Sequence, residues 1–251
     1  MAAHVYYTVN SGLYFSDDNT GIFIDGIHGG ADVGFSPVHP KTVSECAGRI
    51  GIFHDLRALL FTHCHSDHFD AVTVAGLTEK EQPYEKETVP LFLYTPENPL
   101  SRDIPGVTIE PAGTDGTLRI CIGDFEIITV RTRHDGGKPL CFTPHVSFVI
   151  NTPDETFFAA GDAVFTDQSA GQIRSLCRHP VRAAFVNPYQ LLLESDREFL
   201  TDLSADCHVL IHLPLPKDDR YTVKLLYDNA VKKYPEQMPE LLLPGFYTQL
   251  F

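Results

Sequence analysis

Short apolar runs separated by turn residues recur along most of the chain. Runs rich in β-branched and aromatic side chains, bounded by Gly, Pro, Asn, Asp or Ser, predict strands. The predicted strands cover residues 4–10, 21–25, 57–62, 91–94, 107–109, 117–122, 125–132, 146–150, 156–160, 183–186, 208–211 and 241–243. The first two flank the turn-rich stretch 16–20 and therefore predict a hairpin.

Helical periodicity is clearest towards the end of the chain. Between residues 222 and 234, apolar side chains recur at helical spacing and so share one face. That face consists of Val223, Leu226, Tyr227, Ala230, Val231 and Tyr234. Ser195 and Glu198 form a capping-box pattern, which predicts a second helix with Phe199, Leu200 and Leu203 facing inward. A third helix is expected over residues 70–77.

The order of these elements indicates the fold class. A hairpin comes early, and helices alternate with strands later, which predicts sheets covered by helices in an α/β (α+β) sandwich. The chain has 251 residues. Because α/β domains reach this length as one unit, we expect a single domain over residues 1–251.

Five predicted strands end on a histidine or an aspartate. They are Asp25 after IFI, His63 after LLFT, His134 after ITVRTR, Asp162 after FFAAG and His212 after VLI. Sites of α/β folds lie in the loops beyond strand ends. A carboxylate at the end of a buried run, such as that of Asp162, also needs a cation beside it. These side chains are therefore expected to converge on one edge of the sandwich.

The densest chemical signal is the string His-Cys-His-Ser-Asp-His at residues 63–68. Directly after a strand, His63 and His65 point to the same side, because side chains alternate with period two. Cys64 then points away and is not expected to be a ligand. Asp67 and His68 follow one tight turn later and can serve a second ion. Imidazole and carboxylate together suit Zn²⁺, and also Mn²⁺ or Fe²⁺.

In order and placement, these motifs resemble those of the metallo-β-lactamase superfamily. The resemblance rests on Asp25 in IDG, residues 62–68, His134 in RHDG, Asp162 in AAGDA and His212 in VLIH, and it covers most of the chain. It implies a four-layer αββα sandwich with a binuclear metal site. The context of the last histidine is most similar to the L-ascorbate 6-phosphate lactonase-like branch.

The resemblance also implies a role for each motif residue. One metal would be held by His63, His65 and His134. The other would be held by Asp67, His68 and His212, with Asp162 bridging the two ions. Asp25 would lie behind the ligands and orient one of them.

Three further residues are candidates for substrate binding, and one ligand position stays open. His145 competes with His134 for the third-motif position and otherwise is a candidate substrate contact. His28, in the glycine-rich stretch after Asp25, can line the pocket. Arg133 precedes His134 and can bind a phosphate or carboxylate.

Charge and composition narrow the classes of molecule that the protein is expected to bind. The chain carries 19 basic and 33 acidic residues, a net charge of −14, which disfavours nucleic-acid binding because phosphates are repelled at long range. A small-molecule substrate, an anionic one included, is compatible with local cations.

No apolar run approaches the roughly 18 residues of a membrane span. The six cysteines include no C-x-x-C pair, which with the absence of a recognisable secretion signal favours a cytoplasmic protein. The oligomeric state is not indicated.

The expected chemistry is hydrolysis by a water or hydroxide activated between two divalent metals. Asp162 would hold both ions, and Asp67 would orient the nucleophile or move its proton. The scissile bond would belong to an ester, lactone, amide or phosphoester. Two alternatives keep the same residues: a mono-iron dioxygenase acting on thiols, and a non-enzymatic metal- or ligand-binding protein. The full set of donors for a second ion favours the hydrolase.

Overall fold

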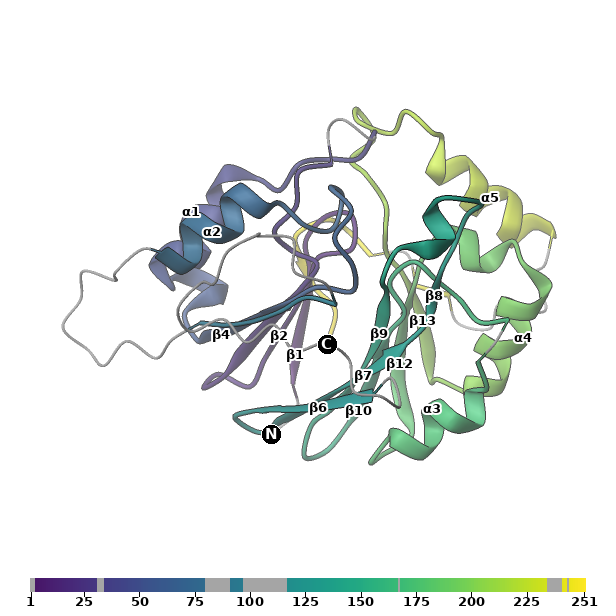
Figure 1. Ribbon diagram of the computed structural model, residues 1–251, viewed down its shortest axis with the longest axis horizontal. Coiled ribbons are helices and arrows are strands. Elements are labelled where there is room, and N and C mark those ends of the chain that lie inside the picture. Colours follow the sequence, from purple (N-terminus) through teal and green to yellow (C-terminus); the bar gives the residue numbers. More distant parts are fainter. Residues whose placement is uncertain are drawn as a thin grey trace.

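Two β-sheets face each other, and helices cover the outer face of each (Figure 1). The computed structural model describes residues 3–30, 34–79, 91–96, 117–166, 168–233, 241–242 and 244–251. The layers run helix, sheet, sheet, helix, which confirms the predicted αββα sandwich. The expected strand at 107–109 lies outside the described residues.

The first sheet combines an antiparallel and a parallel half, in the order β15-β1-β2-β3-β4-β5. Its strands are β1 (His4–Tyr7), β2 (Leu13–Ser16), β3 (Gly21–Ile24), β4 (Leu56–Leu60), β5 (Phe92–Tyr94) and β15 (Thr248–Gln249). Strands β1, β2 and β3 pair antiparallel, whereas β4 pairs parallel with both β3 and β5. The parallel strands deliver their carboxyl ends to one edge.

The predicted hairpin is wrong in its first strand, because β2 lies between the two strands that were expected to pair. The turn at residues 17–20 joins β2 to β3, not the strand at 4–10 to the strand at 21–25. The first strand ends at Tyr7, and Asn10 adopts a left-handed backbone with φ of 53°, which turns the chain back into β2. The four residues of β2 are buried on both faces, so they lack the alternation that marks a half-exposed strand.

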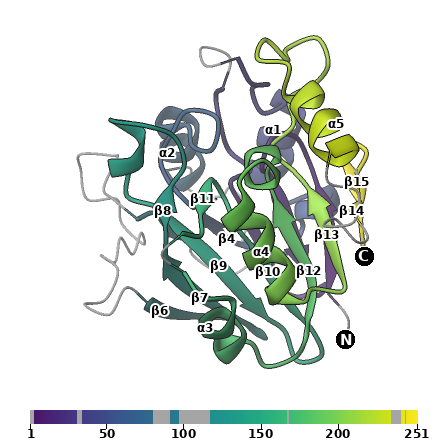
Figure 2. The same ribbon diagram turned by 90° about the vertical axis from the view of Figure 1, so that its right-hand side faces the viewer.

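The second sheet runs in the order β14-β13-β12-β10-β9-β7-β6. Its strands are β6 (Thr117–Ile122), β7 (Phe125–Arg131), β9 (Val146–Asn151), β10 (Thr156–Ala159), β12 (Val181–Val186), β13 (Cys207–Leu210) and β14 (Leu241–Leu242). A short pair, β8 (Arg133–His134) and β11 (Ala163–Val164), sits beyond the ends of the long strands (Figure 2).

Each sheet has its own helices (Figures 1 and 2). Helices α1 (Pro40–Gly48) and α2 (Ala71–Glu79) cover the first sheet, and α3 (Ala170–Leu176), α4 (Glu194–Leu203) and α5 (Val223–Lys233) cover the second. Short 3₁₀ turns occur at η2 (Gly51–Phe53), η3 (Leu140–Phe142) and η4 (Pro188–Leu191). No helix in these described ranges is both long and apolar enough to cross a bilayer.

The capping-box prediction for α4 is wrong, although the helix and its buried face are confirmed. The helix begins at Glu194 with Leu193 as its N-cap, so Ser195 already lies in the first turn. Phe199, Leu200 and Leu203 are buried, as expected. In contrast, Asn187 and Gln190 form a reciprocal capping box at η4, directly beneath the site described below.

An aromatic cluster fixes the two sheets against each other. The ring of Phe15 on β2 lies 5.4 Å from that of Phe157 on β10 and 5.7 Å from that of Phe185 on β12, measured between centroids. All three side chains are fully buried. Edge-to-face aromatic contacts of this kind add to the burial of apolar area.

We expect Phe157→Ala to lower the free energy of unfolding by about 3–5 kcal/mol, because it leaves a cavity between the sheets. Urea denaturation monitored by circular dichroism measures this loss. The matched control is Phe142→Ala, since Phe142 is 68% exposed. Equal losses for both variants would contradict the assignment of Phe157 to the core.

Candidate metal centre

Segments from both sheets meet at one edge of the sandwich. The loop after β4 brings His63, His65, Asp67 and His68 from the first sheet, while the second sheet and its short extension bring His134, Asp162 and His212. Pairing of β8 with β11 places His134 opposite Ala163, next to Asp162. The convergence expected from the strand ends is therefore present.

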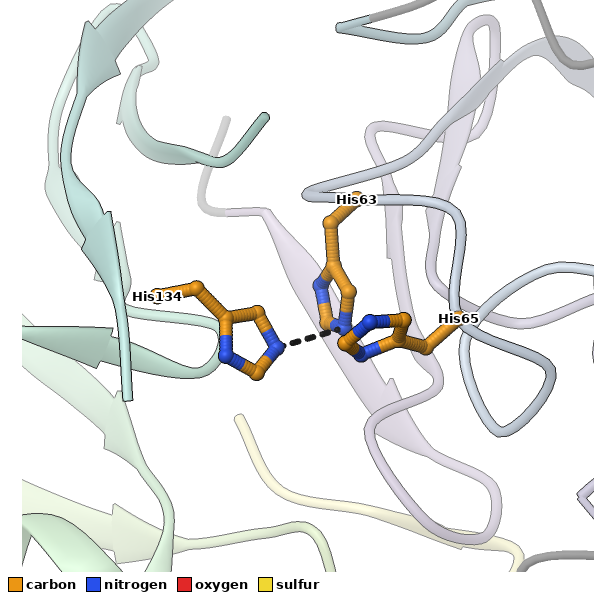
Figure 3. Close-up of side chains that lie close together, drawn as sticks. All are labelled: His63, His65 and His134. Carbon is orange, nitrogen blue, oxygen red and sulfur yellow. Dashed lines mark hydrogen bonds between the residues drawn. The ribbon is translucent and has the colours of Figure 1, made fainter. Parts of the chain in front are cut away.

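Three histidines form the first cluster of potential donors. His63 and His65, from the loop after β4, and His134, from β8, point towards one another (Figure 3), and one ligand atom from each lies within 4.8 Å of the others. The Nε2 atoms of His63 and His134 are 3.3 Å apart. Nε2 of His65 lies 3.1 Å from Oγ1 of Thr143, which leaves Nδ1 as the nitrogen free to bind a cation.

Two aspartates and two histidines form the second cluster. Asp67, His68, Asp162 and His212 are all buried, and their donor atoms again lie within 4.8 Å of one another. Nε2 of His212 is 3.2 Å from Oδ2 of Asp67. Nε2 of His68 is buried without a hydrogen-bond partner, as a nitrogen reserved for a cation would be.

One oxygen, Oδ2 of Asp162, lies between the two clusters. It is 3.4 Å from Nε2 of both His68 and His212, and 3.9 Å and 3.8 Å from Nε2 of His63 and His134. A single carboxylate oxygen within 4 Å of four imidazole nitrogens, two from each cluster, has the placement of a bridging ligand.

Asp25 supports both clusters from behind. Oδ2 of Asp25 accepts hydrogen bonds from Nδ1 of His68 at 3.0 Å and from the hydroxyl of Thr62 at 2.7 Å. The same hydroxyl lies 3.0 Å from Nδ1 of His63. Protons on both Nδ1 atoms leave both Nε2 lone pairs directed at the centre.

His145 lies behind Asp162 instead of facing substrate. Its Nε2 accepts the backbone N–H of Asp162 at 3.0 Å, and its Nδ1 is 2.7 Å from the hydroxyl of Thr132. Gly161 makes this approach feasible, because its φ is 59° and a Cβ there would sit 2.7 Å from Nε2 of His145. His134 therefore lies in the cluster of potential donors, whereas His145 is hydrogen-bonded to the backbone of Asp162.

The other two substrate-binding candidates also lie away from the centre's open side. His28 is buried, with Nδ1 3.2 Å from the side-chain amide of Asn10, and burial lowers its pKa to about 4. Arg133 is exposed, because it points to the face of β8 opposite His134. Neither residue borders the cavity beside the donors.

Several supporting residues have no clear sequence signal. Asn187 and Gln190 hold the Asp162 turn: Nδ2 of Asn187 donates to Oδ1 of Asp162 at 3.0 Å, and Nε2 of Gln190 donates to the Gly161 carbonyl at 3.1 Å. The carbonyl of Asn10 accepts the backbone N–H of His212, which has φ of 61°. The Asn-Pro pair at 187–188 marks a turn, but nothing in the sequence connects it to Asp162.

A model of the Beta-lactamase superfamily domain matches residues 31–212. The chain belongs to this superfamily. The matched range contains both donor clusters but excludes Asp25. A comparison with curated protein sequences gives no match.

Solved structures share the fold of this superfamily domain at low sequence identity. An isothiocyanate hydrolase from Delia radicum gut bacteria aligns with a TM-score of 0.65 and 15% identity over 99% of this chain and 98% of that chain. A metallo-beta-lactamase fold protein from Bacillus subtilis aligns with a TM-score of 0.62 and 13% identity over 99% of both chains. A diiron beta-hydroxylase from Streptomyces venezuelae aligns with a TM-score of 0.56 and 11% identity over 99% of this chain and 54% of that chain. The architecture is therefore the metallo-beta-lactamase fold.

The pKa values of the donor residues bear on how this centre would bind cations. Burial lowers the pKa of His63 well below its ordinary value, with His68 nearby adding to the effect, so this ring stays neutral. Burial alone would raise the pKa of Asp162, but His212 and His68 outweigh it and hold that pKa well below its ordinary value. Neutral imidazoles and ionised carboxylates are the forms that ligate divalent metals. Burial alone would lower the pKa of His68, but Asp162 and Asp25 outweigh it and hold that pKa well above its ordinary value, so a cation bound there would displace a proton. The chemistry of the donor set suits divalent metal ions.

A cavity of about 600 Å³ opens beside the donors. The donor residues on its wall are His65, Asp67, His134, Asp162 and His212. The remaining wall is formed by Phe35, Ser66, Asp135, Gly136, Leu140, Ala163, Val164, Tyr189, Gln190, Leu192, Leu193, Asp196 and Tyr221. A pocket of this size accommodates a small molecule.

Asp25→Asn is expected to weaken metal binding by about 10–100-fold, because an amide cannot accept from His68 and Thr62 as the carboxylate does. Competition with a chromophoric chelator measures the affinity. Asp55→Asn is the matched control: Asp55 is equally buried and accepts from Tyr14 and Ser16, away from the donors. Equal losses of affinity in both variants would indicate a general effect on folding.

Asp196 in the cavity wall gives a pH-dependent prediction. Burial raises its pKa from 3.8 to about 6, against the opposing hydrogen bond from the Phe165 N–H. The folded state therefore binds the proton more tightly, so the ionised side chain destabilises the fold above pH 6 and this penalty fades as pH falls. The free energy of unfolding of Asp196→Asn, taken relative to wild type, should therefore be about 1–3 kcal/mol higher at pH 7.5 than at pH 4.5.

Chemical denaturation of both proteins in EDTA at the two pH values measures this difference. Asp202→Asn, an exposed position on the same helix, controls for the removal of one negative charge. A difference that grows towards low pH would contradict the assignment.

Proposed function

We propose that this protein is a binuclear metal-dependent hydrolase acting on a small molecule. The observation that carries the proposal is the position of Oδ2 of Asp162, within 4 Å of imidazole nitrogens from both clusters. His63, His65 and His134 would hold one ion, and Asp67, His68 and His212 the other, with Asp162 shared. Zinc suits these nitrogen and oxygen donors best, with manganese and iron as further candidates.

When bound, a pair of divalent cations supplies Lewis acidity and lowers the pKa of a coordinated water towards neutrality. The residues of this chain then divide the remaining work. Asp25, Thr62 and His145 keep the donors aligned, because each is hydrogen-bonded to a ligand side chain or to its backbone. Such alignment matters because misplacement by about 1 Å costs rate.

Asp67 is the residue placed to handle the nucleophile. It borders the cavity and lies within hydrogen-bond distance of His212. Burial opposes its ionisation, but the hydrogen bond from His212 and the neighbouring His68 outweigh burial and lower its pKa. Asp67 therefore stays a carboxylate at neutral pH, able to accept a hydrogen bond from an attacking water and to orient it.

The alternatives differ from this proposal in the number and kind of metal. A mono-iron dioxygenase needs one ion, whereas the second cluster offers four further donors, Asp162 included. The fold also occurs in a diiron beta-hydroxylase, so oxidation by two irons is the second candidate. A non-enzymatic binding protein would show no turnover. Placement in the lactonase-like branch and a cytoplasmic location stay predictions.

Metal content and activity test the proposal together. The protein as purified should contain two ions per chain by mass spectrometry of the elements, and EDTA should abolish hydrolysis of a broad ester and lactone panel. Zn²⁺ or Mn²⁺ should restore it without dioxygen. His212→Ala should retain about one ion and lose at least about 100-fold in kcat/KM, since the second cluster would be broken.

His54→Ala is the matched control for this variant, because His54 is exposed and lies outside both clusters. One ion in wild type would overturn the binuclear proposal. Turnover that requires dioxygen would favour the oxidative candidate, and activity unaffected by EDTA would exclude both.

A further inference from the structure

Exposed apolar side chains gather at the cavity beside the metal donors. Leu140, Leu192, Leu193 and Tyr221 are 38–58% exposed, and all four border this cavity. They come from η3, the junction of η4 with α4, and the segment before α5, which lie far apart along the chain. Deeper in the wall, Phe35 and Val164 are buried apolar residues. Apolar surface that converges on a site in this way marks a binding surface for an apolar ligand.

The charged groups on the same wall are acidic. Among the described residues that border the cavity there is no lysine or arginine, whereas Asp67, Asp135, Asp162 and Asp196 all border it. Asp67 and Asp162 belong to the donor clusters. Asp135 lies 3.2 Å from Nδ1 of His134 and forms a third group of possible donors with His134 and Asp162, which leaves Asp196 to repel an anionic group on a substrate.

The surroundings of Asp196 show how poorly this wall stabilises a negative charge. Its side chain is fully buried, and only Oδ1 has a well-formed hydrogen bond, from the N–H of Phe165 at 2.8 Å; Oδ2 has no partner of good geometry. Away from the donors and any ions that they hold, a carboxylate on a substrate would lose water in the same way, and no lysine or arginine among the described lining residues would compensate for it.

We propose that the substrate of this site is an uncharged molecule with an apolar body, not a phosphorylated or carboxylated one. This inference rests on the proposed hydrolase function. The scissile group would lie at the donors, and the apolar body would lie against Leu140, Leu193 and Tyr221. Arg133, the expected anion ligand, is on the opposite face of β8 and takes no part.

Two matched esters test the inference. 4-Nitrophenyl hexanoate and mono-4-nitrophenyl adipate share the leaving group and a six-carbon acyl chain, and they differ in a terminal methyl or carboxylate. With the metal-loaded protein at pH 7.5, we expect kcat/KM to be at least about tenfold higher for the hexanoate. Equal values, or a preference for the adipate, would overturn the inference.

A binding measurement separates this inference from the proposed function. Calorimetry compares hexanohydroxamic acid with the monohydroxamic acid of adipic acid, since a hydroxamate binds metal without turnover. The neutral-tailed compound should bind at least about tenfold more tightly. If neither ester is hydrolysed but this difference holds, the hydrolase proposal fails and the inference about the cavity stands. If the acidic compound binds equally well or better, the inference fails whatever the activity.

The variant Leu140→Lys adds a positive charge to the cavity wall and so tests the contact directly. Leu140 is 45% exposed, so the variant should fold, and the preference for hexanoate should shrink or invert. Leu225→Lys is the matched control, because Leu225 is 53% exposed on α5 and does not border the cavity. An unchanged preference in Leu140→Lys, or the same change in both variants, would count against the proposed contact.

Discussion

The burial of the Asp162 carboxylate is the constraint on which the centre depends. An ionised carboxylate in a protein interior is costly unless positive charge and hydrogen bonds surround it. Oδ1 accepts from Asn187, and Oδ2 faces imidazole nitrogens from four histidines. A pair of divalent cations would satisfy this oxygen and the lone pairs of the imidazoles together, which is why the two clusters are best understood as one site.

The sandwich itself controls whether this site exists. Four candidate donors come from the first sheet and three from the second, so a shift of one sheet against the other would separate them. Two backbone junctions resist such a shift: Val146 N–H donates to the Thr62 carbonyl at 2.9 Å, and Asn10 N–H donates to the Leu213 carbonyl at 3.1 Å. Because cations would bind only the folded arrangement, they would stabilise the packing of the sheets in turn.

The cavity joins two different environments. On one side, polar donors are fixed by Asp25, His145 and Asn187. On the other side, apolar side chains come from three separate segments, and no lysine or arginine is among the described residues of the wall. In the proposed function, the donors would carry out the chemistry and the apolar wall would select the substrate. Folds of this kind acquire different activities through such walls while the scaffold is retained.

The sequence by itself determined the layers of the fold and the residues that gather at the centre. Alternation beyond a strand end predicted that His63 and His65 share one side, and strand ends predicted Asp162 and His212, because both patterns are local consequences of backbone geometry. Tertiary structure alone separated His134 from His145, placed Arg133 away from the cavity and brought Leu140 and Tyr221 to the wall of one cavity. Those outcomes depend on how distant segments pack, and local sequence does not encode which neighbours a loop residue will meet.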